Sequence, residues 1–343
     1  MAQTTEVKNL KFSKDTLLPV VQLVSTGGTI AMKRDPDTNA PVPAISGEDL
    51  LSSVPGVSEI AAVEIINHSN LPSAYLGPEH WVTLTRVIEQ TVARSDIVGV
   101  VISHGTDSLE ETAFWLDLTV KSDKPIVLVG AQRNASEGDS DGPRNLLSAI
   151  QVAIAADSQG CGVLVVMNNQ ISSARDVVKT HTMNVESFNC VAAGFLGFVD
   201  PDRVIFSRKP IRRTHLPLID KHMPLVEIVA MYGGCDGAAV VDAVERGAKG
   251  IVVQALGLGN VNLPTFAAIK AAMSAGVAVV ISSRVPNGRV LPAYGFEGGG
   301  KTLWDGGAIF SDDLGAAKAR ILLMLLLQKG VSTQRGLQAA FDS

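Results

Sequence analysis

Two short turns rich in glycine and hydroxyl side chains hold the residues of this chain that are best able to do chemistry. The first spans residues 25–31 (STGGTIA) and the second residues 103–108 (SHGTDS). Their glycines let the backbone turn sharply and bring its N–H groups close to a bound group, while Thr29 and Thr106 each present a hydroxyl. A threonine hydroxyl becomes a nucleophile when a base activates it. Each turn can therefore carry a nucleophile, an oxyanion-binding backbone, or both.

Two other interpretations of these turns compete with a catalytic one. A phosphate-binding loop is disfavoured, because the lysine of the G-x-x-x-x-G-K-[ST] pattern is missing and the G-x-G-x-x-G arrangement does not occur. A purely structural interpretation makes Asp107 or Ser108 a helix N-cap, followed by two glutamates in the first helical turn. Both roles can coexist if Thr106 and Asp107 face a cleft.

The sequence offers no convincing metal site. His104 could act as a general base or a ligand, but no other histidine or carboxylate stands at metal-ligand spacing, so we expect a buried, hydrogen-bonded histidine. Cys161, Cys190 and Cys235 lie far apart and form no C-x-x-C pair, which argues against both zinc and a disulfide framework. We expect no metal and no organic cofactor.

Short apolar runs alternate with helical patterns along the chain, and the two turns follow such runs. Runs rich in Val and Ile occur at residues 20–24, 63–66, 97–103, 126–129 and 163–167, and helical patterns occur at 78–94, 109–120 and 143–156. The alternation predicts an α/β fold in which a parallel-rich sheet is flanked by helices. Ligands bind such sheets beyond the carboxyl ends of the strands. Four polar segments are expected there, at residues 25–31, 68–70, 103–108 and 130–133.

The length of 343 residues predicts two domains, because one hydrophobic core seldom grows that large. After residue 200 the pattern weakens into a charged, proline-containing stretch, and a second, smaller series of strands and helices follows. We assign residues 1–207 to a larger N-terminal catalytic domain, 208–224 to a linker and 225–343 to a smaller C-terminal α/β domain. The apolar run at residues 321–327 is too short to span a bilayer and predicts a buried helix.

Charge and composition exclude several classes of protein. The net charge of -5 and the lack of a concentrated basic surface argue against nucleic acid as a partner. The modest basic cluster at Arg212 and Arg213 is interpreted as part of a solvated linker. Residues 1–18 carry several charges and no continuous apolar run, so we expect no signal peptide, no membrane association and a cytoplasmic location.

Several motifs resemble the bacterial-type L-asparaginase/glutaminase family. Residues 26–31 (TGGTIA) are similar to its first signature and residues 104–113 (HGTDSLEETA) to its second. Agreement covers nearly the whole chain and continues at residues 123–125 (DKP), 141–143 (DGP), 162–168 (GVLVVMN), 175–177 (RDV), 179–180 (KT) and 283–286 (SRVP). Two long signatures in the right order are far more specific than one. The resemblance implies a threonine-dependent hydrolysis of L-asparagine to L-aspartate and ammonia, with glutaminase activity left open, in a homotetramer of intimate dimers.

The resemblance also implies roles for individual residues. Thr29 would attack the side-chain amide, and a second catalytic group would consist of Thr106, Asp107 and Lys179. A lysine can activate a threonine only if it is desolvated beside it. The substrate would be held by Ser69, Asn70, Asp107 and, from a neighbouring subunit, Asn262. The backbone around Gly28 and Gly105 suits an oxyanion.

The chain departs from the family around the first threonine. The loop after the first signature normally supplies a tyrosine, but residues 32–43 contain none and Ala40 stands about where it should be. Tyr75, in a segment a few residues longer than its family counterpart, is a candidate replacement, and an exposed or packing tyrosine is the alternative. His68 replaces a small residue and Asn70 a glutamine. Two alternatives therefore stay open: the same chemistry on a different small amide, lactam or imide, and an amino-acid sensor without turnover.

Overall fold

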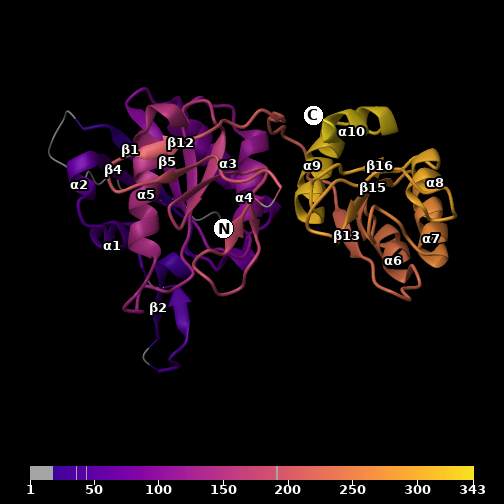
Figure 1. The fold of residues 1–343 in the computed structure, drawn as a ribbon, viewed down its shortest axis with the longest axis horizontal. Coiled ribbons are helices and arrows are strands. Elements are labelled where there is room, and N and C mark those ends of the chain that lie inside the picture. Colours follow the sequence, from indigo (N-terminus) through magenta and orange to yellow (C-terminus); the bar gives the residue numbers. More distant parts are fainter. Residues whose placement is uncertain (1–17, 36, 44, 191) are drawn as a thin grey trace. The chain divides into compact units, whose positions relative to one another are not determined.

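The computed structural model describes residues 18–35, 37–43, 45–190 and 192–343. The chain forms two compact α/β units, of which the first ends at His215 and the second begins at Leu216 (Figure 1). The predicted fold class, two α/β domains with the larger one first, is confirmed. Each unit is built around a sheet of its own.

The first unit is built on an eight-stranded mixed sheet. Its strand order is β12-β11-β8-β7-β6-β5-β1-β4. The five strands from β7 to β4 in this order run parallel, and β8, β11 and β12 extend the sheet with antiparallel pairings. The strands are β1 (Val20–Ser25), β4 (Ala62–Asn67), β5 (Ile97–Ser103), β6 (Ile126–Val129), β7 (Val163–Met167), β8 (Gln170–Ser173), β11 (Gly197–Val199) and β12 (Val204–Phe206).

Helices cover both faces of this sheet, which explains why its central strands are apolar without alternation. Alternate strand residues such as Val101 and Val127 belong to the core beneath the helices on one face, while their neighbours Val100 and Leu128 are equally buried. Figure 1 shows α1 (Gly47–Ser52), α2 (Val57–Ile60) and α5 (Gly142–Ile154) on one side and α3 (Pro78–Ala93) and α4 (Leu109–Thr119) on the other.

Helix α4, which follows the second glycine turn, is fixed against α3. The buried faces of the two helices meet at Trp81 and Trp115, whose rings lie 5.4 Å apart between centroids. Each indole N–H finds a hydroxyl on the other helix: Trp81 donates to Thr112, and Trp115 donates to Thr85, both at 2.9 Å. Buried polar groups that are satisfied in this way define a unique packing, so the start of α4 is held rigidly.

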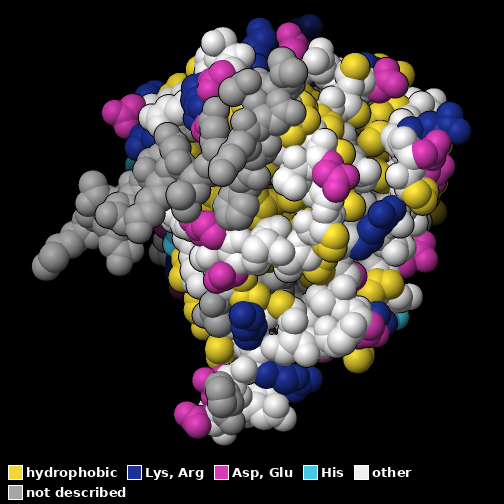
Figure 2. Space-filling view, turned by 90° about the vertical axis from the view of Figure 1, so that its left-hand side faces the viewer, with side chains coloured by type: hydrophobic (Ala, Val, Ile, Leu, Met, Phe, Trp, Pro, Cys, Tyr) yellow, Lys and Arg dark blue, Asp and Glu magenta, His cyan; other side chains and the backbone are white. Residues whose placement is uncertain are grey.

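The first unit also carries two short antiparallel hairpins in its described residues. One pairs β2 (Met32–Arg34) with β3 (Pro41–Pro43), and the other pairs β9 (Val178–Lys179) with β10 (Phe188–Asn189). The β2–β3 hairpin extends from the lower end of the face drawn in Figure 2. On that face Lys and Arg side chains are interspersed with Asp and Glu. The described residues of the unit also form the 3-10 turns η1 (Thr29–Ala31), η2 (Ser73–Tyr75) and η3 (Ala156–Ser158).

The second unit has a four-stranded parallel sheet of order β13-β14-β15-β16. Its strands are β13 (Val226–Ala230), β14 (Gly250–Ala255), β15 (Ala278–Ser283) and β16 (Ile309–Phe310), and its helices are α6 (Ala238–Glu245), α7 (Leu263–Ser274), α8 (Gly300–Asp305), α9 (Ala316–Gln328) and α10 (Gln334–Phe341). Helix α9 contains the predicted buried run, with Ile321 and Leu323 fully buried. Within the described residues, no helix has both the length and the apolar character that crossing a membrane requires.

The basic stretch at the end of the first unit is exposed along much of its length and makes a few polar contacts with that unit. Arg213 donates to the carbonyl of Gly160 at 3.0 Å and forms an ion pair with the buried carboxylate of Asp117 at 3.7 Å. Lys209 donates to the carbonyl of Gln159 at 3.2 Å. Two neutral carbonyl acceptors and one buried carboxylate thus hold this stretch against the first unit, and the sequence pattern does not reveal these partners.

Candidate active site

The two glycine turns lie side by side at the carboxyl ends of neighbouring strands. β1 pairs in parallel with β5, so Ser25 and Ser103 stand opposite each other at the strand ends. Beyond them, Thr26 donates to the carbonyl of Ser103 twice, from its backbone N–H at 3.1 Å and from its hydroxyl at 2.8 Å. These bonds extend the sheet register into the turns and fix the first turn against the second.

Gly28 and Gly105 bring the two turns into backbone contact. Gly28 has a φ of 86°, a left-handed conformation that favours glycine. A Cβ atom on Gly28 would lie 2.2 Å from both the Cα and the N of Gly105, which leaves no room for any side chain. Because Thr29 and Thr106 directly follow these glycines, the contact sets the spacing of the two hydroxyl-bearing residues.

Lys179 joins the second threonine to a carboxylate. Its ammonium donates to the Thr106 hydroxyl at 2.8 Å and lies 3.1 Å from Oδ1 of Asp107. Thr106 is buried, whereas the Lys179 side chain is 19% exposed and that of Asp107 is 68% exposed. The structure thus assembles, across 73 positions of sequence, a hydroxyl, an amine and a carboxylate that is open to a ligand.

The β9–β10 hairpin that carries Lys179 is tied to the loop after β6. The backbone N–H of Thr180 donates to the carbonyl of the fully buried Ser187 at 2.7 Å. The Ser187 hydroxyl accepts a hydrogen bond from the Gln132 side chain. Gln132 is in turn held by its own N–H, which donates to the Asp141 carboxylate at 3.1 Å. The fourth polar segment predicted from the sequence, residues 130–133, therefore supports the hairpin.

The segment after β4 contacts both turns. Ser69 donates from its hydroxyl to the carbonyl of Thr26 at 3.0 Å, and the hydroxyl of Ser73 accepts from the backbone N–H of Asp107 at 3.2 Å. Ser108 donates to the carbonyl of Ser73 at 2.6 Å. Ser73 was not anticipated, because no motif distinguishes it from other loop serines. Its role becomes visible only through its contact with a turn 34 residues away.

Several other described residues that were predicted for the site form no hydrogen bond with the group of Thr106, Asp107 and Lys179. Tyr75 ends the η2 turn and is 69% exposed. Asn70 and Ala40 are also exposed. In the part of the chain that the structure describes, no group hydrogen-bonds to the half-buried Thr29 hydroxyl. Asn262 belongs to the second unit.

Asn262 already has a structural task there. Its side-chain oxygen caps α7 by accepting from Thr265 N–H at 3.1 Å, and its NH₂ donates to the carbonyl of Cys235 at 2.6 Å. The same NH₂ group also lies 3.6 Å from Sγ of Cys235, so a further partner of the amide would replace that weak contact.

Two histidines near the turns have lowered pKa values. His104 is fully buried and its Nδ1 lies 2.7 Å from the carbonyl of Gly105, as expected for a structural histidine. Burial lowers the pKa of His104 to about 4. The pKa of His68 is lowered as well, by burial and by the neighbouring His80. Among the described residues, no group of three His, Cys, Asp or Glu side chains is placed to hold a metal ion.

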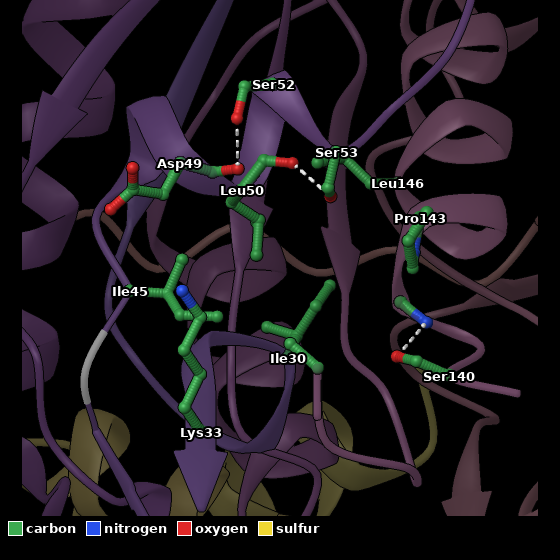
Figure 3. A pocket seen from close by; sticks show the side chains of 12 residues that line it. Ile30, Lys33, Ile45, Asp49, Leu50, Ser52, Ser53, Ser140, Pro143 and Leu146 are labelled. Carbon is green, nitrogen blue, oxygen red and sulfur yellow. Dashed lines mark hydrogen bonds between the residues drawn. The ribbon is translucent and has the colours of Figure 1, made fainter. Parts of the chain in front are cut away.

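A separate pocket of about 310 Å³ lies next to the first turn (Figure 3). It lies among the η1–β2 segment, α1 and the start of α5, and Ile30, Lys33, Leu50 and Leu146 are among its lining residues. None of the predicted catalytic residues lines it. It adjoins the site through Ile30, which follows Thr29 in the chain, and through Ser140 and Gly142, which flank Asp141.

Comparison with known proteins gives consistent matches over both units. Residues 20–212 match the family "Asparaginase, N-terminal", and residues 225–341 match the "Glutaminase/Asparaginase C-terminal domain". L-asparaginase 2 of Bacillus subtilis is 36% identical, covering 99% of this chain and 91% of the relative. L-asparaginase 2 of Escherichia coli is 37% identical, covering 93% and 91%. A crystal structure of a probable cytoplasmic L-asparaginase from Campylobacter jejuni superposes with a TM-score of 0.86 at 35% identity, covering 94% of this chain and 99% of that one.

Proposed function

The chain belongs to the asparaginase family, with both of its domains present, and we propose that it hydrolyses the side-chain amide of L-asparagine to L-aspartate and ammonia. The predicted enzyme class, a hydrolase of amide C–N bonds, is confirmed by this membership. The observation that carries the proposed mechanism is the contact of the Lys179 ammonium with both Thr106 and Asp107, beside the joined glycine turns.

In the proposed mechanism the reaction proceeds through an acyl-enzyme. The Thr29 hydroxyl attacks the amide carbonyl carbon and gives up its proton. The C–N bond of the tetrahedral intermediate then breaks, and the NH₂ group leaves as ammonia after receiving that proton. Thr106 and Lys179 then relay a proton as water attacks the ester, which releases L-aspartate and restores Thr29. The N–H groups of the turns at Gly28 and Gly105 are suited to the oxyanion, since backbone donors fixed in advance need no reorganisation.

The proposed substrate contacts follow from charge and exposure. The Asp107 carboxylate is largely exposed yet anchored by the Lys179 ammonium at 3.1 Å, so it can meet the α-ammonium of an amino acid. Ser69 and Asn70 on the adjoining segment would bind the α-carboxylate, with the Ser69 hydroxyl turning from the Thr26 carbonyl, to which it donates at 3.0 Å, to the substrate. Asn262 would complete this set from a second copy of the chain. We accordingly propose a homotetramer acting in the cytoplasm, without metal or organic cofactor.

A second candidate function is the same chemistry on another small amide, lactam or imide. It is favoured by the exposed Ala40 in the β2–β3 hairpin, where the family has a tyrosine, together with His68 beside the substrate serine. We propose Tyr75 as the group that assists Thr29 in either case, since it ends a segment that is hydrogen-bonded to both turns through Leu71 and Ser73.

Ammonia release from a panel of amides tests the proposal. The panel comprises L-asparagine, D-asparagine, L-glutamine and succinamate, which release ammonia on hydrolysis, and glutarimide, whose ring opening releases none and is followed as formation of glutaramate by chromatography. Each compound is assayed with the wild type and with Thr29→Ala and Thr106→Ala. We expect L-asparagine to be the best substrate and each variant to lose at least about 100-fold in kcat. Thr83→Ala, which removes an exposed hydroxyl bonded within α3, is the matched control and should keep full turnover.

Each other outcome points to a different function. Hydrolysis only of compounds that are not amino acids, seen as ammonia from succinamate or as glutaramate from glutarimide, would favour the second candidate. Tight binding of L-asparagine without hydrolysis of any compound would favour an amino-acid sensor and contradict both enzymatic proposals.

A further inference from the structure

Glu110 contacts Lys179 from the first turn of α4, which directly follows the glycine turn that carries Thr106 and Asp107. Its carboxylate accepts a hydrogen bond from the backbone N–H of Lys179. The ammonium at the other end of that residue contacts Thr106 and Asp107. Residues 106–110 therefore contact Lys179 at two points, at its backbone N–H and at its side-chain ammonium.

The lysine needs such an anchor because its own element is a weak scaffold. β9 and β10 pair over two residues each, Val178–Lys179 with Phe188–Asn189. A two-stranded hairpin is only marginally stable by itself in water, and this one is unusually short. The lysine side chain adds four rotatable bonds between the backbone and the ammonium. A fixed main chain is thus required if the ammonium is to stay 2.8 Å from the Thr106 hydroxyl.

A carboxylate at position 110 also has an ordinary explanation. Glu110 and Glu111 both lie in the first turn of α4, where negative charge is stabilised by the helix dipole. That explanation applies to both residues equally. It does not account for a carboxylate of this turn reaching the backbone N–H of a residue 69 positions away on another element.

We infer that Glu110 is a positioning residue, which fixes the main chain of Lys179 so that the ammonium reaches Thr106. The inference rests on the catalytic role proposed for Lys179. A charged acceptor forms a shorter and stronger hydrogen bond to an N–H group than a neutral one. Displacement of a catalytic group by about 1 Å can lower turnover about 100-fold.

The test measures kcat and KM for L-asparagine with substitutions at position 110. Glu110→Ala removes the acceptor and should lower kcat about 10- to 100-fold while KM changes much less. Glu110→Gln keeps an acceptor oxygen of the same reach and should stay within about 5-fold of the wild type. Glu110→Asp keeps the charge at the helix end but shortens the side chain, so it should lose turnover even though the helix is intact. Glu111→Gln removes the neighbouring charge and should leave kcat unchanged.

A double variant separates this inference from the proposed function. If Glu110 acts through Lys179, then Glu110→Ala combined with Lys179→Met should be no slower than Lys179→Met alone. If Lys179→Met is slow but Glu110→Ala lowers kcat further by its full factor, the inference is overturned while the role of Lys179 stands. If Lys179→Met keeps wild-type kcat, the role of Lys179 and the inference both fail. Should Glu110→Ala not fold by circular dichroism, Glu110→Asp decides in its place, and unchanged kcat there would overturn the inference.

Discussion

The two threonines of the candidate site differ in their surroundings. Thr106 is buried and hydrogen-bonded to Lys179, whereas Thr29 is half-buried and lies on a 3-10 turn. A hydroxyl without a neighbouring base is a poor nucleophile. Lys179 is the partner of the Thr106 hydroxyl, and the Thr29 hydroxyl needs a base from another segment.

Substitution of Tyr75 tests the proposed partner. We expect Tyr75→Phe to lower kcat for the best substrate at least about 10-fold, because it removes a proton-transferring hydroxyl. Its melting temperature should not change, since the side chain is 69% exposed and contributes little packing. The kcat and the melting temperature of Tyr75→Phe and of the wild type are measured on the same preparations. Full turnover in Tyr75→Phe would remove Tyr75 from the mechanism.

The buried His104 should make the stability of the first unit depend on pH. Its pKa is about 4 when folded, against about 6.5 for an unperturbed histidine. Between these values the unfolded chain binds a proton that the folded chain does not, so stability is fully present above pH 6.5 and is lost as the pH falls toward 4. The loss is at most about 3 kcal/mol.

Urea unfolding at pH 7.5 and pH 5 measures this effect. His104→Gln should lose less stability than the wild type over that interval, because the variant has no imidazole to protonate at this position. An equal loss in both proteins would mean that other groups cause the pH dependence, among them His68, whose lowered pKa acts in the same direction.

At the scale of elements, the contact between the glycine turns dominates. Gly28→Ala combines a strained positive φ with a clash against the Gly105 backbone, and we expect it to destabilise the first unit by more than about 3 kcal/mol. Gly56→Ala is the matched control: Gly56 has a φ of 77°, but a Cβ atom there would meet nothing within 4 Å, so only the strain of about 1 kcal/mol applies. Urea unfolding of both variants measures the difference. Similar losses in the two would show that backbone strain, rather than the contact, is the cause.

The sequence predicted the elements that are buried on both faces and missed the short ones. The strand at 97–103 and the helix starting at Pro78 match the structure, since each has a long, unambiguous pattern. β9 and β10 contain only two residues each, too few for any periodicity. The antiparallel strand β8 also escaped prediction, because its residues QISS carry little apolar signal.

For the site, the sequence located the turns but not their mutual contacts. Thr29 and Thr106 follow recognisable strands, so their placement at one edge of the sheet could be anticipated. The touching of Gly28 and Gly105 depends on parallel pairing of β1 with β5, and the approach of Lys179 depends on a hairpin with no sequence pattern. Pairings of this kind are set by tertiary packing rather than by local preference.

At the scale of the whole molecule, the proposed assembly makes Asn262 a residue shared between copies of the chain. Asn262→Ser keeps an oxygen that can cap α7 but removes the amide donor. We expect about a 10-fold or greater loss in kcat/KM in Asn262→Ser alone. When it is refolded together with inactive Lys179→Met, hybrid assemblies should regain activity, because some sites then receive both intact residues.

Size and activity together check this expectation. Light scattering should give about four times the chain mass of 36.0 kDa. As a control, each variant is refolded alone in parallel, and it should not gain activity. A monomeric mass, or hybrids no more active than their parents, would contradict a site shared across an interface.

The backbone contact of Gly28 with Gly105 also limits how the substrate range of this protein can be engineered. Neither position can accept a side chain, and each turn is fixed by the other, so a library that diversifies the turns would consist mostly of proteins that do not fold. Segment 71–77 is the better target for diversification, because only a few hydrogen bonds join it to the turns: Leu71 N–H donates to Thr26, and Ser73 accepts from Asp107 and Ser108, while Tyr75 is largely exposed. New amide specificities should therefore arise from changes in that segment, with the two turns left untouched.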